Sequence, residues 1–307
     1  MTATGVDAGR AGFRHSAAFY SGLDGLLDAV VPFVREGLDA GEPVLVAEVP
    51  EHLEALRCAL DGDADRVAYL DIAAIGANPA RIIPAWRAFV ADHGDRPVRG
   101  VGEPAWVGRR PVELEECRLH EALLNVAFDD AADFSLLCPY DRDGLPAEVL
   151  AGAQRTHPFV EGATYGGHDD AATQFSAALA PAPAGAVEEG FDLERLSGLR
   201  RRVRDLALAA GLGDEATDEV VLAVHELACN SVEHAGGSGV LRSWSDPCSL
   251  VMEVSDGGTI TDLLVGREQA MSLSDCGRGV WLANQLCDLV QLRSSAAGTT
   301  VRLHSWL

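Results

Sequence analysis

The sequence predicts two α/β domains: a mainly parallel α/β sheet domain first, and a two-layer α/β sandwich after it. Three observations lead to this prediction. Helical and strand-like segments alternate along the first half, a proline- and alanine-rich stretch follows, and the last part reads as two helices and then antiparallel strands. A chain of 307 residues is also comfortable for two domains. The predicted boundaries are 1–170, a linker over 171–190, and 191–307.

Two sequence signals alternate along the first domain. Residues 22–37 repeat apolar side chains at helical spacing, whereas 43–49 form a short apolar run that is typical of a buried strand. The same signals predict further helices at 51–60, 79–93, 112–127 and 146–156, and further strands at 66–71, 98–102 and 134–138. Such alternation implies a mainly parallel sheet covered by helices.

The second domain follows a stretch that is rich in Pro, Ala and Gly at 180–190. Beyond this linker we predict helices at 193–210, 214–234 and 279–286, and strands near 240–243, 250–255, 289–294 and 299–305. Helices followed by antiparallel strands indicate a two-layer α/β sandwich.

Composition excludes several classes of function. The net charge of −23 argues against nucleic acid as a partner, because phosphate backbones would be repelled. All 24 basic residues are Arg, which excludes a Walker-type lysine and lysine-based covalent chemistry. The 7 Cys include no C-x-x-C pair, so neither a zinc ribbon nor a disulfide framework is indicated. Without a signal sequence or an apolar run of about 18 residues, we expect a cytoplasmic chain with no membrane partner.

The most informative segment is His225–His234. Helical spacing places Glu226, Asn230 and His234 on one face of one helix, and apolar residues including Leu222 are expected to bury the other side. A carboxylate and an amide one turn apart suit phosphoryl transfer. The amide oxygen can ligate Mg²⁺, and the carboxylate can orient or deprotonate a nucleophile.

Three later motifs complete the pattern. Residues 254–258 read as a strand that ends in Asp256 and a glycine turn, where the carboxylate could accept a hydrogen bond from an adenine amino group. Residues 276–282 place Arg278 between glycines at a helix start, which suits phosphate groups. Residues 298–303 read as a final strand with hydroxyls near its start.

These four motifs, in this order, resemble the ATP-binding domain of the GHKL superfamily over about residues 190–307. The short form, without a dimerising histidine helix, is similar to the anti-sigma-factor serine/threonine kinases of bacterial partner switching. The resemblance implies that Mg·ATP lies between the long helix and a lid at 259–275. It implies a general base at Glu226, a Mg²⁺ ligand at Asn230, an adenine contact at Asp256, and further nucleotide contacts at His234, Gly258, Gly277, Arg278, Gly279 and Thr300.

The resemblance implies protein partners as well. The phosphate acceptor would be a Ser or Thr of an anti-anti-sigma-type protein, and a sigma factor would be the other partner. Two alternatives stay open: an ATP-binding module that sequesters its partner without phosphate transfer, and a histidine kinase, which the missing dimerisation hairpin disfavours. The turn reads D-G-G-T where the superfamily commonly has D-x-G-x-G-P, so the start of the lid is undefined. Homodimer formation is also left open.

Five motifs of the first domain form a second ordered set. They read F-R-H with F-Y, E-G-L-D-A-G-E, V-R-G-V-G-E-P-A-W, L-C-P-Y-D and T-H-P, at 13–20, 36–42, 98–106, 137–141 and 156–158. Together they resemble the MEDS sensory domain of methanogen and methylotroph regulators. This resemblance implies a small-molecule sensor, of unknown ligand, that regulates the kinase domain.

Polar residues at strand or loop ends are candidates for the sensor pocket, because such ends commonly form the ligand crevice of an open α/β sheet. They are His15, Glu103, Cys138, Asp141 and His157. A metal site from His15, Cys138 and His157 is chemically open. The nearby His120-Glu121 pair superficially resembles a histidine-kinase phosphoacceptor box. We interpret that pair as a solvated helix face, since no second hairpin helix accompanies it.

Overall fold

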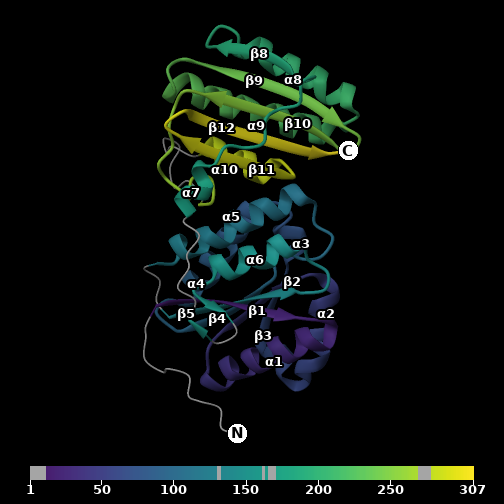
Figure 1. Ribbon diagram of the computed structural model, residues 1–307, viewed down its shortest axis with the longest axis vertical. Coiled ribbons are helices and arrows are strands. Elements are labelled where there is room, and N and C mark those ends of the chain that lie inside the picture. Colours follow the sequence, from purple (N-terminus) through teal and green to yellow (C-terminus); the bar gives the residue numbers. More distant parts are fainter. Residues whose placement is uncertain (1–11, 130–132, 161–162, 165–170, 269–277) are drawn as a thin grey trace. The chain divides into compact units, whose positions relative to one another are not determined.

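The computed structural model describes residues 12–129, 133–160, 163–164, 171–268 and 278–307 (Figure 1). They form two compact units: residues 1–74 with 85–169, and residues 75–84 with 170–307. Among the helices that the structure describes, none combines the length and the apolar character needed to cross a membrane.

The first unit is built on a parallel sheet. In the described residues it has seven strands in the order β3-β2-β4-β5-β1-β6-β7, and only the last pair is antiparallel. The strands are β1 (Phe13–Tyr20), β2 (Val44–Glu48), β3 (Val67–Asp71), β4 (Val98–Gly102), β5 (Phe134–Asp141), β6 (Phe159–Val160) and β7 (Ala163–Thr164). The predicted mainly parallel α/β fold is confirmed.

Helices connect these strands. They are α1 (Gly22–Ala40), α2 (Pro50–Leu60), α3 (Ile72–Ile75), α4 (Ile82–His93), α5 (Pro111–Ala127) and α6 (Ala147–Thr156), with 3-10 turns η1 (Asp61–Arg66) and η2 (Pro79–Arg81). The helix predicted from residue 79 therefore begins as a separate turn. There the Asn78 side chain accepts a hydrogen bond from the Ala80 backbone N–H at 3.1 Å, and Pro79 occupies the first position of η2.

Strand β1 lies in the interior of the sheet, between β5 and β6, although the sequence did not predict it. Its residues F-R-H-S-A-A-F-Y lack a regular apolar alternation. The core-facing position at its centre is occupied by His15, which is fully buried. A buried imidazole needs polar partners, so this strand is specified by residues far away in the sequence.

Two glycines of β4 make room for the indole of Trp86 on α4. Trp86 is 2% exposed, and a Cβ atom at Gly100 would lie 2.8 Å from its ring and 3.0 Å from Leu136 Cδ1. A Cβ atom at Gly102 would lie 2.9 Å from the same ring. The V-R-G-V-G pattern of this strand is therefore a packing requirement of the core.

The second unit is a two-layer α/β sandwich, as predicted. Its described strands form one antiparallel sheet in the order β11-β12-β10-β9-β8, and α8, α9 and α10 cover one face of it (Figure 1). The elements are α7 (Ala171–Ser176), β8 (Val187–Asp192), α8 (Leu196–Ala210), α9 (Asp214–His234), β9 (Ser238–Asp246), β10 (Ser249–Asp256), α10 (Arg278–Leu286), β11 (Leu289–Ser295) and β12 (Gly298–Trp306).

The segment predicted as a linker contains α7 and the first residues of β8. Strand β8 pairs with β9 at the edge of the sheet, yet most of its side chains are exposed and only Phe191 is buried. Because only one apolar side chain of this edge strand is buried, its sequence lacks the alternation of apolar and polar residues that predicts a strand. Its pairing comes from backbone hydrogen bonds to β9.

Residues 75–84 belong to the second unit and supply hydrogen-bond donors to the C-terminal end of α10. The Arg81 guanidinium donates to the main-chain oxygens of Asn284, Gln285 and Cys287 at 2.6, 3.0 and 2.8 Å. These carbonyls have no partners within the helix itself, and a cation there also interacts favourably with the helix dipole.

We expect Gly100→Ala to destabilise the first unit by about 1–3 kcal/mol, because the new methyl group would force Trp86 out of its position. Hydrogen exchange of β4 and β5 peptides in the full chain measures this loss of protection. Gly62→Ala is the matched control, since a Cβ atom there has no neighbour within 4 Å. Equal protection in the two variants would contradict this account of the β4 glycines.

Candidate functional site

Helix α9 positions the predicted phosphoryl-transfer residues. Gly213 precedes it, and Asp214 and Glu215 occupy the first turn, where negative charge interacts favourably with the positive end of the helix dipole. Its buried face runs through positions 217, 220, 221, 223, 224, 227, 228 and 231. Leu222, predicted to be buried, is instead 39% exposed, because the core-facing stripe lies on either side of it.

A cavity of about 290 Å³ opens at the C-terminal end of α9. It brings together four of the predicted nucleotide-site residues, namely Asn230, His234, Asp256 and Gly258. Its other walls come from Ala235, Thr259, Ile260, Thr261, Asp262, Val265, Val280 and Thr299. An amide, a carboxylate and hydroxyls around one partly apolar cavity suit a polar, ring-containing ligand.

Asp256 is held in place by two hydrogen bonds. Its Oδ1 accepts from the Gly258 backbone N–H at 2.8 Å, and its Oδ2 accepts from the Ser231 hydroxyl at 2.6 Å. Ser231 directly follows Asn230 on α9 and is buried. This hydrogen bond therefore ties the helix that carries Asn230 to the strand that carries Asp256. Ser231 is a site residue that sequence reasoning missed.

The start of α10 packs closely on the polar face of α9. A Cβ atom at Gly279 would lie 2.5 Å from Asn230 Nδ2 and 3.4 Å from Glu226 Cβ, so a larger residue would displace the Asn230 amide. Glu226 itself does not line the cavity, and Arg278 is exposed at the first position of α10. Gly277 lies outside the residues that the structure describes.

On β12 the hydroxyl that borders this cavity is that of Thr299, whereas the sequence pointed to Thr300. Thr299 pairs with Asp256 across β10 and β12, lines the cavity, and donates to the Gly258 main-chain oxygen at 2.9 Å. Thr300 pairs with Ser255 and does not line this cavity; it lines a second cavity, which Asp256 and Thr299 also border. The sequence did contain a signal for Thr299. Residues two apart on a strand share a face, so Thr299 lies on the same face as the apolar Val301, which is buried.

The five predicted sensor residues do not form one pocket. Glu103 belongs to a group at the carboxyl ends of parallel strands, with Tyr20, Glu48 and His52. The Tyr20 hydroxyl donates to Glu103 Oε1 at 2.7 Å, and His52 Nδ1 lies 3.0 Å from Glu103 Oε2 and 3.3 Å from Glu48 Oε2. Asp141 lies beside Tyr20 in the register of β1 and β5, and its side chain accepts a turn hydrogen bond from the Asp143 backbone N–H at 2.9 Å.

A proton on His52 holds this group together. Hydrogen bonds to Glu103 and Glu48 raise the pKa of His52 to about 10, against the desolvation that would lower it. Burial raises the pKa of the Glu48 carboxyl well above its usual range, and the nearby charge of Glu103 adds to this. One buried carboxylate and one imidazolium then balance each other.

The other three predicted residues, His15, Cys138 and His157, meet Glu121 of α5. Their potential ligand atoms all lie within 4.8 Å of one another. The interpretation of His120-Glu121 as a solvated helix face is therefore wrong, since these side chains are 0% and 2% exposed. Helix α5 is buried on more than one side, which a pattern of charged residues conceals.

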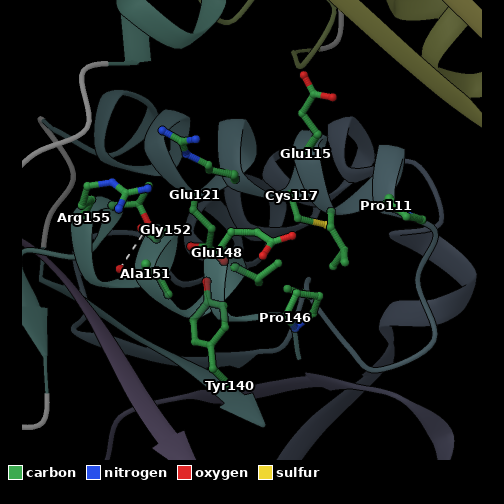
Figure 2. A pocket seen from close by; sticks show the side chains of 16 residues that line it. Pro111, Glu115, Cys117, Glu121, Tyr140, Pro146, Glu148, Ala151, Gly152 and Arg155 are labelled. Atoms are coloured by element: carbon green, nitrogen blue, oxygen red, sulfur yellow. Dashed lines mark hydrogen bonds between the residues drawn. The ribbon is translucent and has the colours of Figure 1, made fainter. Parts of the chain in front are cut away.

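A cavity of about 400 Å³ lies between α5 and α6 above β5, and Glu121 reaches it. Figure 2 shows Glu121 and Tyr140 pointing toward one another in this cavity, with Glu115, Glu148 and Arg155 around it. Burial raises the pKa of the Tyr140 hydroxyl well above its usual range.

Comparison with known families assigns both halves of the chain. Residues 14–158 match the profile of MEDS, the methanogen/methylotroph DcmR sensory domain, and residues 191–305 match that of the histidine kinase-like ATPase domain. No curated protein matches the chain significantly. A crystal structure of the RsbU and RsbW domains of Rv1364c from Mycobacterium tuberculosis is similar at 20% identity and a TM-score of 0.31. The similarity covers 40% of this chain and 33% of that one.

We expect His52 to titrate far above the ordinary histidine value of 6.5, near its shifted value of about 10. The stability that its positive charge contributes is complete below about 6.5 and is lost as the pH rises through about 10. An NMR titration of the His52 ring protons measures this pKa. Glu103→Gln should lower it, whereas Glu54→Gln, on the exposed side of α2, should not. An ordinary titration in the unmodified chain would refute the assignment.

Proposed function

We propose that this chain, which joins a MEDS sensory domain to a histidine kinase-like ATPase domain, is a ligand-regulated protein kinase of the cytoplasm. The observation that carries the proposal is the cavity at the end of α9, where Asn230, Asp256 and Gly258 border one space inside the ATPase domain. The predicted acid–amide helix and the D-G-G turn meet there.

The residues of this cavity fit Mg·ATP chemically. The Asn230 amide oxygen suits Mg²⁺, a hard cation that takes oxygen ligands, and the bound ion would neutralise phosphate charge. Asp256, held by Ser231 and Gly258, presents a fixed carboxylate that can accept a hydrogen bond from the adenine amino group. The buried Thr299 hydroxyl supports the same side of the cavity.

We further propose serine/threonine kinase activity in partner switching, with an anti-anti-sigma-type protein as phosphate acceptor and a sigma factor as second partner. The sequence resemblance supports this class. In the described part of the second unit, both α8 and α9 pack on the sheet or on each other, which leaves neither helix available as a histidine-kinase dimerisation hairpin.

The second candidate function is an ATP-binding module that sequesters its partner without phosphate transfer. One observation favours it: Glu226, the proposed base, does not line the cavity in the described residues. Incubation of the chain with labelled ATP and candidate anti-anti-sigma proteins separates the two functions. Label transferred to a Ser or Thr supports the kinase, and stable complexes without label support sequestration.

Asp256→Asn should weaken ATP binding by roughly 10- to 150-fold, because a hydrogen bond to a charged group contributes about 1.5–3 kcal/mol. The asparagine can still accept from Gly258 and bond to Ser231, so the turn should persist. Isothermal titration calorimetry with Mg·ATP measures the loss. Asp205→Asn, exposed on α8, is the matched control and should bind normally. Unchanged affinity in Asp256→Asn would remove Asp256 from the nucleotide site.

Glu226→Gln should lower phosphate transfer by at least about 100-fold while ATP affinity stays within a few-fold, since a general base acts mainly in the transition state. Glu233→Gln, exposed near the end of the same helix, serves as the control for a lost carboxylate on α9. The measurements are initial rates of partner phosphorylation and calorimetry. Transfer that survives in Glu226→Gln would assign the base to another residue.

A further inference from the structure

Four polar side chains are shut away from water in the first unit. His15 lies on β1, Glu121 on α5, Cys138 on β5, and His157 directly after α6. Their exposures are 0%, 2%, 1% and 0%, respectively. We call these residues the His–Cys–Glu cluster. So complete a burial of four titratable side chains requires partners for all of them.

Hydrogen bonds fix how both imidazoles present their nitrogens. Asn125 Nδ2 donates to the main-chain oxygens of Glu121 and Thr156 at 3.3 and 2.8 Å, which turns the Asn125 Oδ1 toward His15. His15 Nδ1 lies 3.2 Å from that oxygen, so it carries the hydrogen. His157 Nδ1 lies 2.8 Å from the main-chain oxygen of Ala153, which can only accept.

Both rings therefore direct Nε2 into the cluster. The Nε2 atoms of His15 and His157 lie 3.0 and 3.2 Å from the same oxygen of Glu121, and His15 Nε2 lies 3.4 Å from Cys138 Sγ. A lone pair on neutral Nε2 would repel a carboxylate oxygen at such a distance. A proton, on a ring or on the carboxyl group, or a metal ion must lie between these atoms.

The Glu121 carboxylate favours a metal ion over a proton. Among the described residues, neither of its oxygens has a hydrogen-bond partner of good geometry, nor has His157 Nε2. The group around His52 behaves differently, because there Nδ1 itself approaches two carboxylates at hydrogen-bond distance. In the His–Cys–Glu cluster the contacts are short but the donors are not aligned.

We propose that the His–Cys–Glu cluster is a zinc site, with His15 Nε2, His157 Nε2, Cys138 Sγ and one Glu121 oxygen as ligands. Zinc bonds of about 2.0–2.3 Å in a tetrahedron place ligand atoms roughly 3.3–3.7 Å apart. Three of the six separations, 3.0, 3.2 and 3.4 Å, approach these edges, and all six lie within 4.8 Å. Two neutral imidazoles, one thiolate and one carboxylate also balance the charge of Zn²⁺, which a buried site requires.

The surroundings fit such a site. Metal-bound histidines usually donate their other ring N–H to a carbonyl or carboxylate, as His15 and His157 do to Asn125 and Ala153. The cavity between α5 and α6 reaches Glu121 and provides an entry path for the ion (Figure 2). The site lies wholly within the first unit and does not depend on the nucleotide-binding proposal.

The first test is metal content and coordination in the full chain, without nucleotide. Elemental analysis of protein loaded with Zn²⁺ and desalted should find one ion per chain. X-ray absorption at the zinc edge should find one sulfur and three nitrogen or oxygen neighbours. Metal-free protein titrated with Co²⁺ should develop a thiolate-to-cobalt charge-transfer band. These measurements need no variant, so they stand even if a substituted chain fails to fold.

The second test uses matched cysteine variants. Cys138→Ser should abolish the cobalt band, whereas Cys58→Ser, at an exposed cysteine, should retain it. Asn125→Ala should weaken Zn²⁺ binding by about 10- to 100-fold, because the His15 ring loses its support. If the folded chain binds no stoichiometric zinc, the proposal is wrong, and the four side chains form a protonated histidine–carboxylate cluster instead. A bound zinc with several sulfur neighbours, or a band that survives Cys138→Ser, would overturn it as well.

Discussion

The need to pair polar groups that are removed from water shapes both units of this chain. An unpaired buried donor or acceptor costs on the order of 1–3 kcal/mol, which is a large share of a domain's net stability. In the first unit, the buried residues Glu48, Glu103 and His15 sit on or directly after strands of the parallel sheet. Each is matched by a residue from a helix, so the same contacts that satisfy the polar groups also fix the helices on the sheet.

In the second unit, polar side chains are paired differently on the two faces of the sheet. On the helix-covered face, the Ser231–Asp256 hydrogen bond joins α9 to β10 and leaves the site carboxylate beside an open cavity. On the other face, Arg302 donates twice to Glu253, which also accepts from Arg242. The Arg302 guanidinium also lies over the ring of Trp244, so an ionic ladder and an aromatic side chain cover this face together. Strand alternation thus separates a binding face from a structural one, and it assigns Thr299 to the former.

Much of this architecture could be predicted, because periodicity and turn residues are local signals. The long helix with Asn230, the D-G-G turn after Asp256 and the alternation of the first domain all follow from neighbours in sequence. Strand β1 and the burial of Glu121 could not be predicted in this way. Each depends on a partner supplied by a distant segment, and a single sequence contains no record of which segments meet.

The two candidate sites differ in how much water they admit, and this difference constrains what each can bind. Asn230 and His234 border a cavity with partly exposed walls, which suits a large ligand that exchanges with solvent. Glu121 and the two histidines beside it are almost fully buried, and of these three only Glu121 borders the cavity between α5 and α6. The ligand proposed for this cluster is accordingly a small ion that gives up its own water. A signal of that kind would change the charge and rigidity of the core beneath α5 and α6, where the contacts that hold the helices to the sheet are also made.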